Sequence, residues 1–354
     1  MKNIIKTVIV MLTSISLFTS ANAGELTVTG TAKATYNITS GYDSKGKALG
    51  VANEFDLGAS GELDNGFTWK YQIQMDPGNS TSVSSSSEVE NDDSQLTLTT
   101  PYGTMGVFIS EGGLDLEDGA SQSVYGRPTD IGDPSGTSDN YDIDGTNNVQ
   151  YHTPSDLLPF GIAIKVGYAP NSQDTNNSAN GSGQLATRAA TTHQSTQGVQ
   201  IKAQPIDGLN VGVSFVEGKD GGTETTVHQN ASSYAVMASY AIGSFNLGAS
   251  YADSEPLVAS IATPTTTAKS YEQNNYSVAF AVNDALSLSV EMEESEKIAL
   301  DKATANVKQT STAIQAAYTM GGMTLALSMG EYEDVGYAKG KDASQALLAV
   351  SMAF

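Results

Sequence analysis

The sequence predicts an all-β protein: a transmembrane, antiparallel, up-and-down β-barrel of sixteen strands. Three observations predict this fold. Apolar and polar residues alternate along the chain, short and long connections also alternate, and the last residues form an apolar strand that ends on Phe354. Only 39% of the 354 residues are hydrophobic, and the mean hydropathy is −0.22. This composition excludes a helical membrane protein but not a membrane barrel, because every second residue of a barrel strand is polar.

The first element is a secretory signal peptide at residues 1–23. Two lysines give it a positive start, an apolar run follows at residues 7–18, and Ala-Asn-Ala at residues 21–23 fits the small-x-small cleavage rule. A membrane-anchoring helix is the alternative, but the run is shorter than the ~20 residues that such a helix needs. We therefore expect export, with residues 24–354 forming one barrel domain.

The strands are predicted from alternation with a period of two. In residues 285–293 (ALSLSVEME), leucine, valine and methionine alternate with serine and glutamate. Such a pattern gives a strand one apolar and one polar face. The same pattern occurs at 67–75, 209–215 and 323–329, and further strands are expected at 199–204, 245–251 and 276–282.

The connections between strands fall into two classes. Tight turns rich in Gly, Pro, Asn and Asp are expected near 64–66, 101–103, 155–160, 205–208, 242–243, 283–284 and 320–322. Longer polar loops are expected at 39–50, 77–92, 111–146, 170–195, 218–230, 253–272, 295–307 and 333–341. Because seven turns and eight loops alternate, they connect sixteen strands with every short link at one end, as in bacterial outer-membrane barrels.

The final segment, Ala343 to Phe354, carries apolar side chains on one face. We expect it to pair with the first strand, Leu26 to Ile38, so that no sheet edge remains unpaired. Aromatic residues also gather near strand ends, as two interfacial girdles require. Those near the turns are Phe67, Phe160, Tyr240, Phe245, Tyr318 and Phe354, and those near the loops are Tyr36, Tyr168, Tyr234 and Tyr251.

Together these features resemble the Gram-negative general porins over the whole mature chain. The segment Asn147–Pro154 (NNVQYHTP), followed by Gly161-Ile162, is similar to the family segment that opens the strand after the third loop. The start Gly24–Ala32 (GELTVTGTA) and the closing strand are also similar. The resemblance implies a homotrimer of water-filled channels for small hydrophilic solutes, with the third loop folded inward. It also implies an outer membrane with its lipid and lipopolysaccharide, and Phe354 as the signal for the barrel assembly machinery.

In this family the third loop narrows the pore, and here it is the longest loop and strongly acidic, with Arg127 as its only basic residue. Acidic groups in a confined bore raise the local concentration of cations, so we expect a cation-preferring pore. The acidic residues expected at the constriction are Glu111, Asp115, Glu117, Asp118, Asp130 and Asp133. The family places basic residues on the opposing wall, and the lumen-facing candidates by parity are Lys33, Lys70, Lys165 and Lys202. Strands one to five contain no Arg, so a strong transverse field is not expected.

Other candidate sites do not predict chemistry. Residues 140–145 (NYDIDG) have the front half of a calcium loop, but Tyr151 stands where its bidentate Glu belongs. The chain has no Cys, its three His are scattered, and no hydrolase or nucleotide-binding motif is present. The paired Glu293-Glu294 is expected at a strand end beside a loop, where solubility explains it. We therefore expect no enzyme activity, no metal and no cofactor, and a net charge of −22 argues against nucleic-acid partners.

Three alternatives stay open at this stage. The Ser-rich second loop, residues 77–92, is either a latch onto a neighbouring subunit or an unstructured loop. The channel is either a general diffusion pore or a substrate-specific porin, although the strand aromatics mostly face outward, where they cannot form a sugar track. The last alternative is that the whole protein is a secreted adhesin or surface-structural β protein. This function conflicts with the repeated apolar face of the strands.

Overall fold

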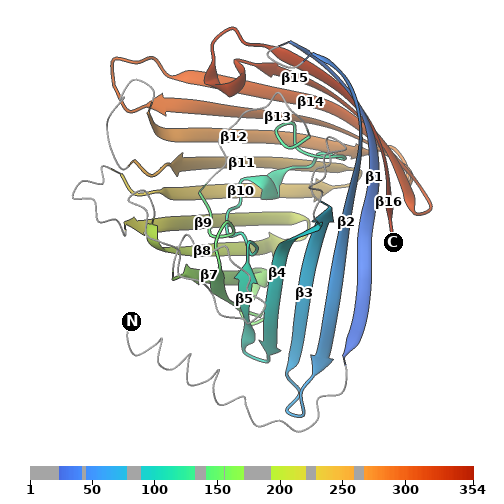
Figure 1. The fold of residues 1–354 in the computed structure, drawn as a ribbon, viewed down its shortest axis with the longest axis vertical. Coiled ribbons are helices and arrows are strands. Elements are labelled where there is room, and N and C mark those ends of the chain that lie inside the picture. The colour runs from blue at the N-terminus through green and yellow to red at the C-terminus, as the bar shows by residue number, and fades with distance from the viewer. Residues whose placement is uncertain are drawn as a thin grey trace.

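The computed structural model describes residues 24–41, 45–77, 89–131, 141–154, 156–170, 193–220, 229–258 and 267–354. Sixteen strands each pair antiparallel with their neighbours in the chain, and β1 pairs with β16 to close a barrel (Figure 1). The predicted strand number and fold class are confirmed. The strands are β1 (Glu25–Gly41), β2 (Gly46–Glu62), β3 (Thr68–Pro77), β4 (Val89–Thr100), β5 (Gly103–Ile109), β6 (Asn148–His152), β7 (Ala163–Ala169), β8 (His193–Ile206), β9 (Leu209–Asp220), β10 (Ser232–Ile242), β11 (Phe245–Glu255), β12 (Ala268–Ala281), β13 (Leu286–Ala299), β14 (Val307–Met320), β15 (Met323–Glu333) and β16 (Ala343–Ala353).

Helical structure among the described residues is limited to three short 3-10 turns, η1 (Asp118–Ala120), η2 (Pro159–Gly161) and η3 (Val335–Tyr337). None of the helices in this part of the chain is long and apolar enough to cross a membrane.

The two faces of each strand differ as the alternation predicts. On β13, Leu288 and Val290 are 41% and 48% exposed, whereas Ser289 and Glu291 are 3% and 0% exposed. Large apolar side chains therefore cover the outside of the barrel and polar side chains line its inside. This is the reverse of a water-soluble protein, and it is the arrangement that lipid outside and water inside require.

The seam between the first and last strands includes the C-terminal residue. Eleven residue pairs join β1 to β16, from Thr31–Ala353 to Gly41–Ala343. Beyond the last pair, the backbones of Gly30 and Phe354 exchange two hydrogen bonds of 3.0 Å. The Phe354 ring also packs edge-on against Phe55 of β2, with 5.6 Å between ring centroids. The prediction that the terminal strand closes the barrel is confirmed.

Several strands extend further than the sequence pattern indicated. The expected first loop at 39–50 was too long, because β1 continues to Gly41 and β2 begins at Gly46. In the same way, β13 continues to Ala299, and β11 and β12 take up both ends of the expected loop at 253–272. The physical reason is that polar residues do not end a barrel strand: pairing with the neighbouring strand satisfies their backbone groups outside the apolar belt as well as within it.

Candidate pore constriction

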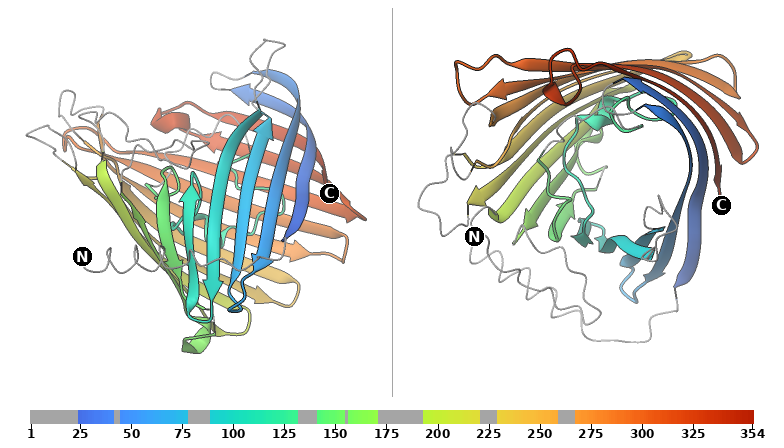
Figure 2. Two further views of the ribbon diagram at one scale, coloured as in Figure 1. Left: turned by 60° about the horizontal axis from the view of Figure 1, so that its bottom comes forward. Right: turned by 45° about the horizontal axis from the view of Figure 1, so that its top comes forward.

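We define loop three as residues 110–147 between β5 and β6, and its described residues, 110–131 and 141–147, run inside the barrel (Figure 2). Its apolar side chains pack on the inner wall in sequence order. Leu114 is buried against β7 and β9, and Leu116 against β10 and β11. Val124 and Tyr125 pack against β14, β15 and β16. The described part of the loop thus follows the wall from β7 round to β16.

Serine hydroxyls and a missing side chain let the loop backbone approach this wall. Ser250 of β11 donates a 2.6 Å hydrogen bond to the carbonyl of Glu117, and Ser277 of β12 donates one of 3.0 Å to the carbonyl of Ala120. A Cβ atom at Gly248 would lie only 1.7 Å from that Ala120 oxygen. The wall therefore needs glycine at this position for η1 to rest against β11.

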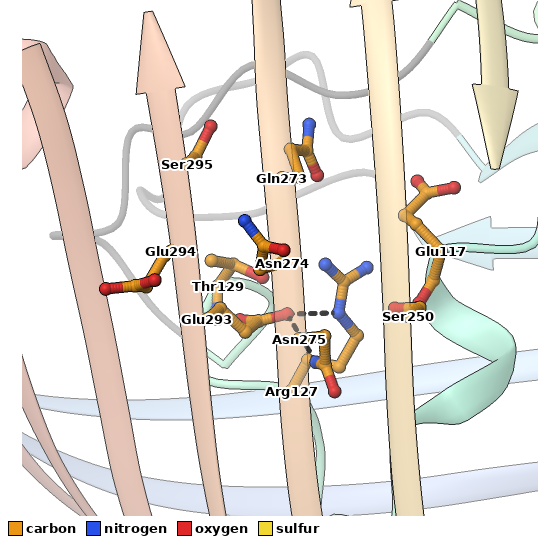
Figure 3. Close-up of a pocket in the computed structure, with 10 residues that line it drawn as sticks. All are labelled: Glu117, Arg127, Thr129, Ser250, Gln273, Asn274, Asn275, Glu293, Glu294 and Ser295. Atoms are coloured by element: carbon orange, nitrogen blue, oxygen red, sulfur yellow. Dashed lines mark hydrogen bonds and ion pairs between the residues drawn. The ribbon is translucent and has the colours of Figure 1, made fainter. Parts of the chain in front are cut away.

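An ion pair fastens the middle of the loop. The Nε of Arg127 lies 2.6 Å from Oε1 of Glu293 on β13, and the second carboxylate oxygen of Glu293 accepts the backbone N–H of Thr129 at 3.0 Å (Figure 3). The neighbouring inward carboxylate, Glu291, accepts a 2.6 Å hydrogen bond from a loop-three serine hydroxyl. Both glutamates are buried. Since a buried carboxylate needs hydrogen-bond donors and a counter-charge, these contacts hold the loop to β13.

The placement of this anchor corrects one expectation. Glu293 and Glu294 do not lie at a strand end, because β13 continues six residues beyond Glu293 to Ala299. Glu293 faces the loop inside the barrel, whereas Glu294 pairs with Lys308 of β14 at 2.5 Å. Sequence parity assigned Glu291 and Glu293 to the polar face, but it held no signal for their partner, because Arg127 is 166 residues away.

Carboxyl groups of loop three gather at its start and at its return. The Oδ2 of Asp142 accepts the backbone N–H groups of Leu114 (2.7 Å) and Asp115 (3.2 Å), which ties the two ends of the loop together. Burial, the charge and hydrogen bond of Glu117 and the charge of Asp144 raise the pKa of Asp115 to about 8. Burial, followed by the charges of Asp115 and Asp144, raises the pKa of Asp142 to about 7. At neutral pH the loop therefore carries less negative charge than its sequence suggests.

The sequence matches the model of a family described as Gram-negative porin over residues 9–353. The chain belongs to the Gram-negative porin family. A comparison with curated proteins finds no match. The porin family and the closed barrel establish an outer-membrane channel for small solutes, and they point to a channel rather than to an enzyme or a secreted adhesin.

Solved structures similar to this porin share its fold at low sequence identity. The anion-selective porin from Comamonas acidovorans aligns with a TM-score of 0.67 and 12% identity, over 94% of this chain and all of that chain. The Salmonella typhi OmpF complex with daunomycin aligns with a TM-score of 0.66 and 15% identity, over 95% of this chain and all of that one. A loop-deletion mutant of OmpT from Vibrio cholerae has a TM-score of 0.64 and 14% identity, over 94% and 100%.

The predicted constriction acids of this porin fall into two groups. Asp115 and Glu117 lie at the start of the loop, next to Asp142, and Glu111 precedes them as a half-buried residue. Asp118 and Asp130 are mostly exposed and surround Arg127: Asp118 is ion-paired with its guanidinium, and Asp130 lies 4.0 Å from its Nε. The remaining prediction, Asp133, lies outside the described residues.

The four predicted lumen lysines do not form one wall. Lys33 of β1 and Lys70 of β3 lie on strands away from the β7–β11 face that carries the start of loop three, and the Nζ of Lys33 sits 5.7 Å from the centroid of the Tyr125 ring. Lys165 of β7 and Lys202 of β8 lie beside each other next to the loop. An opposing-wall role therefore remains a proposal only for Lys33 and Lys70.

The half calcium loop lacks a complete set of ligands among the described residues. Asp142 and Asp144 lie in the described part of loop three, whereas Asn140 falls outside it. Nowhere in the described ranges do three or more His, Cys, Asp or Glu side chains come together in a way that could hold a metal ion.

Proposed function

We propose that this porin is a general diffusion channel that prefers cations. The observation that carries the proposal is the position of loop three: an acidic segment is fastened inside the barrel, where each solute must pass it. Carboxylates in a narrow bore attract cations and repel anions, because low-dielectric walls limit screening.

The preference is moderate rather than strong. The positive charge of Arg127 partly neutralises the carboxylates of Asp118 and Asp130. The raised pKa values of Asp115 and Asp142 leave these two groups partly protonated at neutral pH. The similar fold of the anion-selective porin from Comamonas acidovorans supports the view that selectivity depends on the constriction side chains and not on the barrel. Reversal potentials across planar bilayers under a salt gradient test the preference directly.

The proposal includes assembly and export. We expect a homotrimer, for which the support is family membership and a similar structure, OmpT of Vibrio cholerae, described in a trimer form. Residues 1–23 would serve as the cleaved signal peptide, and Phe354 as the signal for the barrel assembly machinery. Most of the candidate latch in loop two, residues 78–88, lies outside the described residues. Trimer-sized migration on a native gel that collapses on boiling is the expected result, and a monomer resistant to crosslinking would contradict it.

A further inference from the structure

The inner face of β2 carries two carboxylates that the sequence analysis did not single out. Phe55 points outward, since it is 38% exposed and its ring meets Phe354 at the outer seam. Because successive side chains of a strand point to opposite faces, its neighbours Glu54 and Asp56 point into the barrel. Both are half-buried, and neither takes part in any ion pair found among the described residues.

Glu54 lies next to Lys33, a β1 residue that contacts loop three. In the β1–β2 register Glu54 pairs with Thr31, and Lys33 pairs with Ala52. Glu54 and Lys33 are therefore diagonal neighbours, with about 7–8 Å between their Cα atoms. Lys33 in turn reaches the ring of Tyr125 in the loop, 5.7 Å from its centroid. Glu54 therefore lies close to a contact between loop three and the β1–β2 wall.

Asp56 is held by uncharged partners. Its Oδ1 accepts a 3.0 Å hydrogen bond from Nε2 of Gln72 on β3, and Oε1 of Gln72 accepts a 3.4 Å bond from Gln95 on β4. Amide donors orient a carboxylate without cancelling its charge. The predicted lumen lysine on β3 is Lys70, which pairs with Ser60 of β2. Ser60 is four residues from Asp56, so Lys70 lies about 13 Å further along the strands than Asp56.

We propose that Glu54 and Asp56 are specificity-determining residues that draw cations through the pore from the wall facing loop three. The inference rests on the proposed cation preference, and it assigns part of that preference to the β2 wall in addition to loop three. Carboxylates on the wall opposite an acidic loop lower the energy of a cation between the wall and the loop, whereas a basic wall facing an acidic loop sets up a transverse field. On β1–β3 the two carboxylates offset the charges of Lys33 and Lys70, so the wall as a whole is not basic.

The test is the double variant Glu54→Gln/Asp56→Asn, which keeps side-chain shape and removes two charges. The full-length porin is reconstituted into planar bilayers, and the cation-to-anion permeability ratio is derived from reversal potentials in a potassium chloride gradient. We expect the ratio to fall at least about twofold relative to the unmodified porin. The matched control is Glu331→Gln/Glu333→Gln, which removes two exposed charges from the outer face of β15, and we expect it to leave the ratio unchanged.

The outcomes separate the inference from the function on which it rests. An unmodified porin that prefers chloride overturns the proposed function, whatever the variants do. A cation-preferring porin whose ratio is the same in the double variant overturns the inference alone. If the double variant does not insert as a channel, the single variants Glu54→Gln and Asp56→Asn are measured in its place, and an unchanged ratio in both overturns the inference equally.

Discussion

At the scale of single residues, the ion pair between Arg127 and Glu293 joins a loop to a strand that is remote in sequence. The guanidinium is mostly buried and the carboxylate more so. Removing one partner of a buried pair leaves an uncompensated charge. The Arg127→Gln variant should therefore unfold with a free energy lower by about 3–5 kcal/mol, measured by urea titration in detergent.

The same variant should also loosen loop three, which is visible as larger current fluctuations in the open channel. The control is Lys308→Gln, which breaks the more exposed pair with Glu294 on the outer face and should cost at most about 1 kcal/mol. Equal losses in the two variants would show that the Arg127 pair does not anchor the loop.

The raised pKa values of Asp115 and Asp142 predict a pH-dependent selectivity. As the pH rises from 5 to 9 through the folded-state values of about 7 and about 8, both groups lose their protons and loop three becomes more negative. The cation-to-anion permeability ratio should therefore increase with pH. The Asp115→Asn variant should show a smaller increase, and a ratio constant between pH 5 and pH 9 in the unmodified porin would contradict the assignment.

The sign of the linked stability change is also fixed. Asp115 has a higher pKa in the folded protein than its ordinary value of 3.8. Between these values the folded state binds more protons than the unfolded state, so the free energy of unfolding falls as the pH rises. The physical cause is the burial of Asp115, followed by its proximity to the carboxylates of Glu117 and Asp144.

At the scale of the elements, alternation predicted which face is apolar for the strands with a clear period of two. Leu288 lies on the outside of β13 and Ser287 on the opposite face. A lysine in place of Leu288 should cost roughly 2–4 kcal/mol if it lies near the bilayer midplane, whereas Ser287→Lys should be tolerated. Unfolding free energies of the two variants in lipid vesicles provide the measurement, and equal costs would reverse the assignment of faces.

The ends of the elements were less predictable than their faces. The residues around Gly41 and Gly46 are polar or small and indicate a loop, yet β1 pairs with β2 as far as Thr39–Gly46 and with β16 as far as Gly41–Ala343. Strand pairing depends on the neighbouring strand, which a local pattern cannot report. The acidic character of loop three was evident from the sequence. Its anchors on β11 to β16 were not, because they also depend on residues that are distant in the chain. Those anchors are single serines, glycines and glutamates that become neighbours only when the barrel closes.

At the scale of the whole molecule, the acidic residues have two different uses. Glu291 and Glu293 are buried and bind loop three to the wall, so they contribute little free charge to the pore. Glu54 and Asp56 remain outside every ion pair found in the described ranges and face the lumen. A net charge of −22 is therefore a poor measure of selectivity. The position of each carboxylate relative to the loop decides its effect on a passing ion.

The most direct test of the account is the zero-current potential of the unmodified porin in a planar bilayer at neutral pH, with potassium chloride more concentrated on one side. We predict that the dilute side becomes positive, because potassium crosses more readily than chloride past the acidic loop. A dilute side that becomes negative would show that chloride crosses more readily, and it would contradict the claim that the carboxylates of loop three and β2 govern the pore.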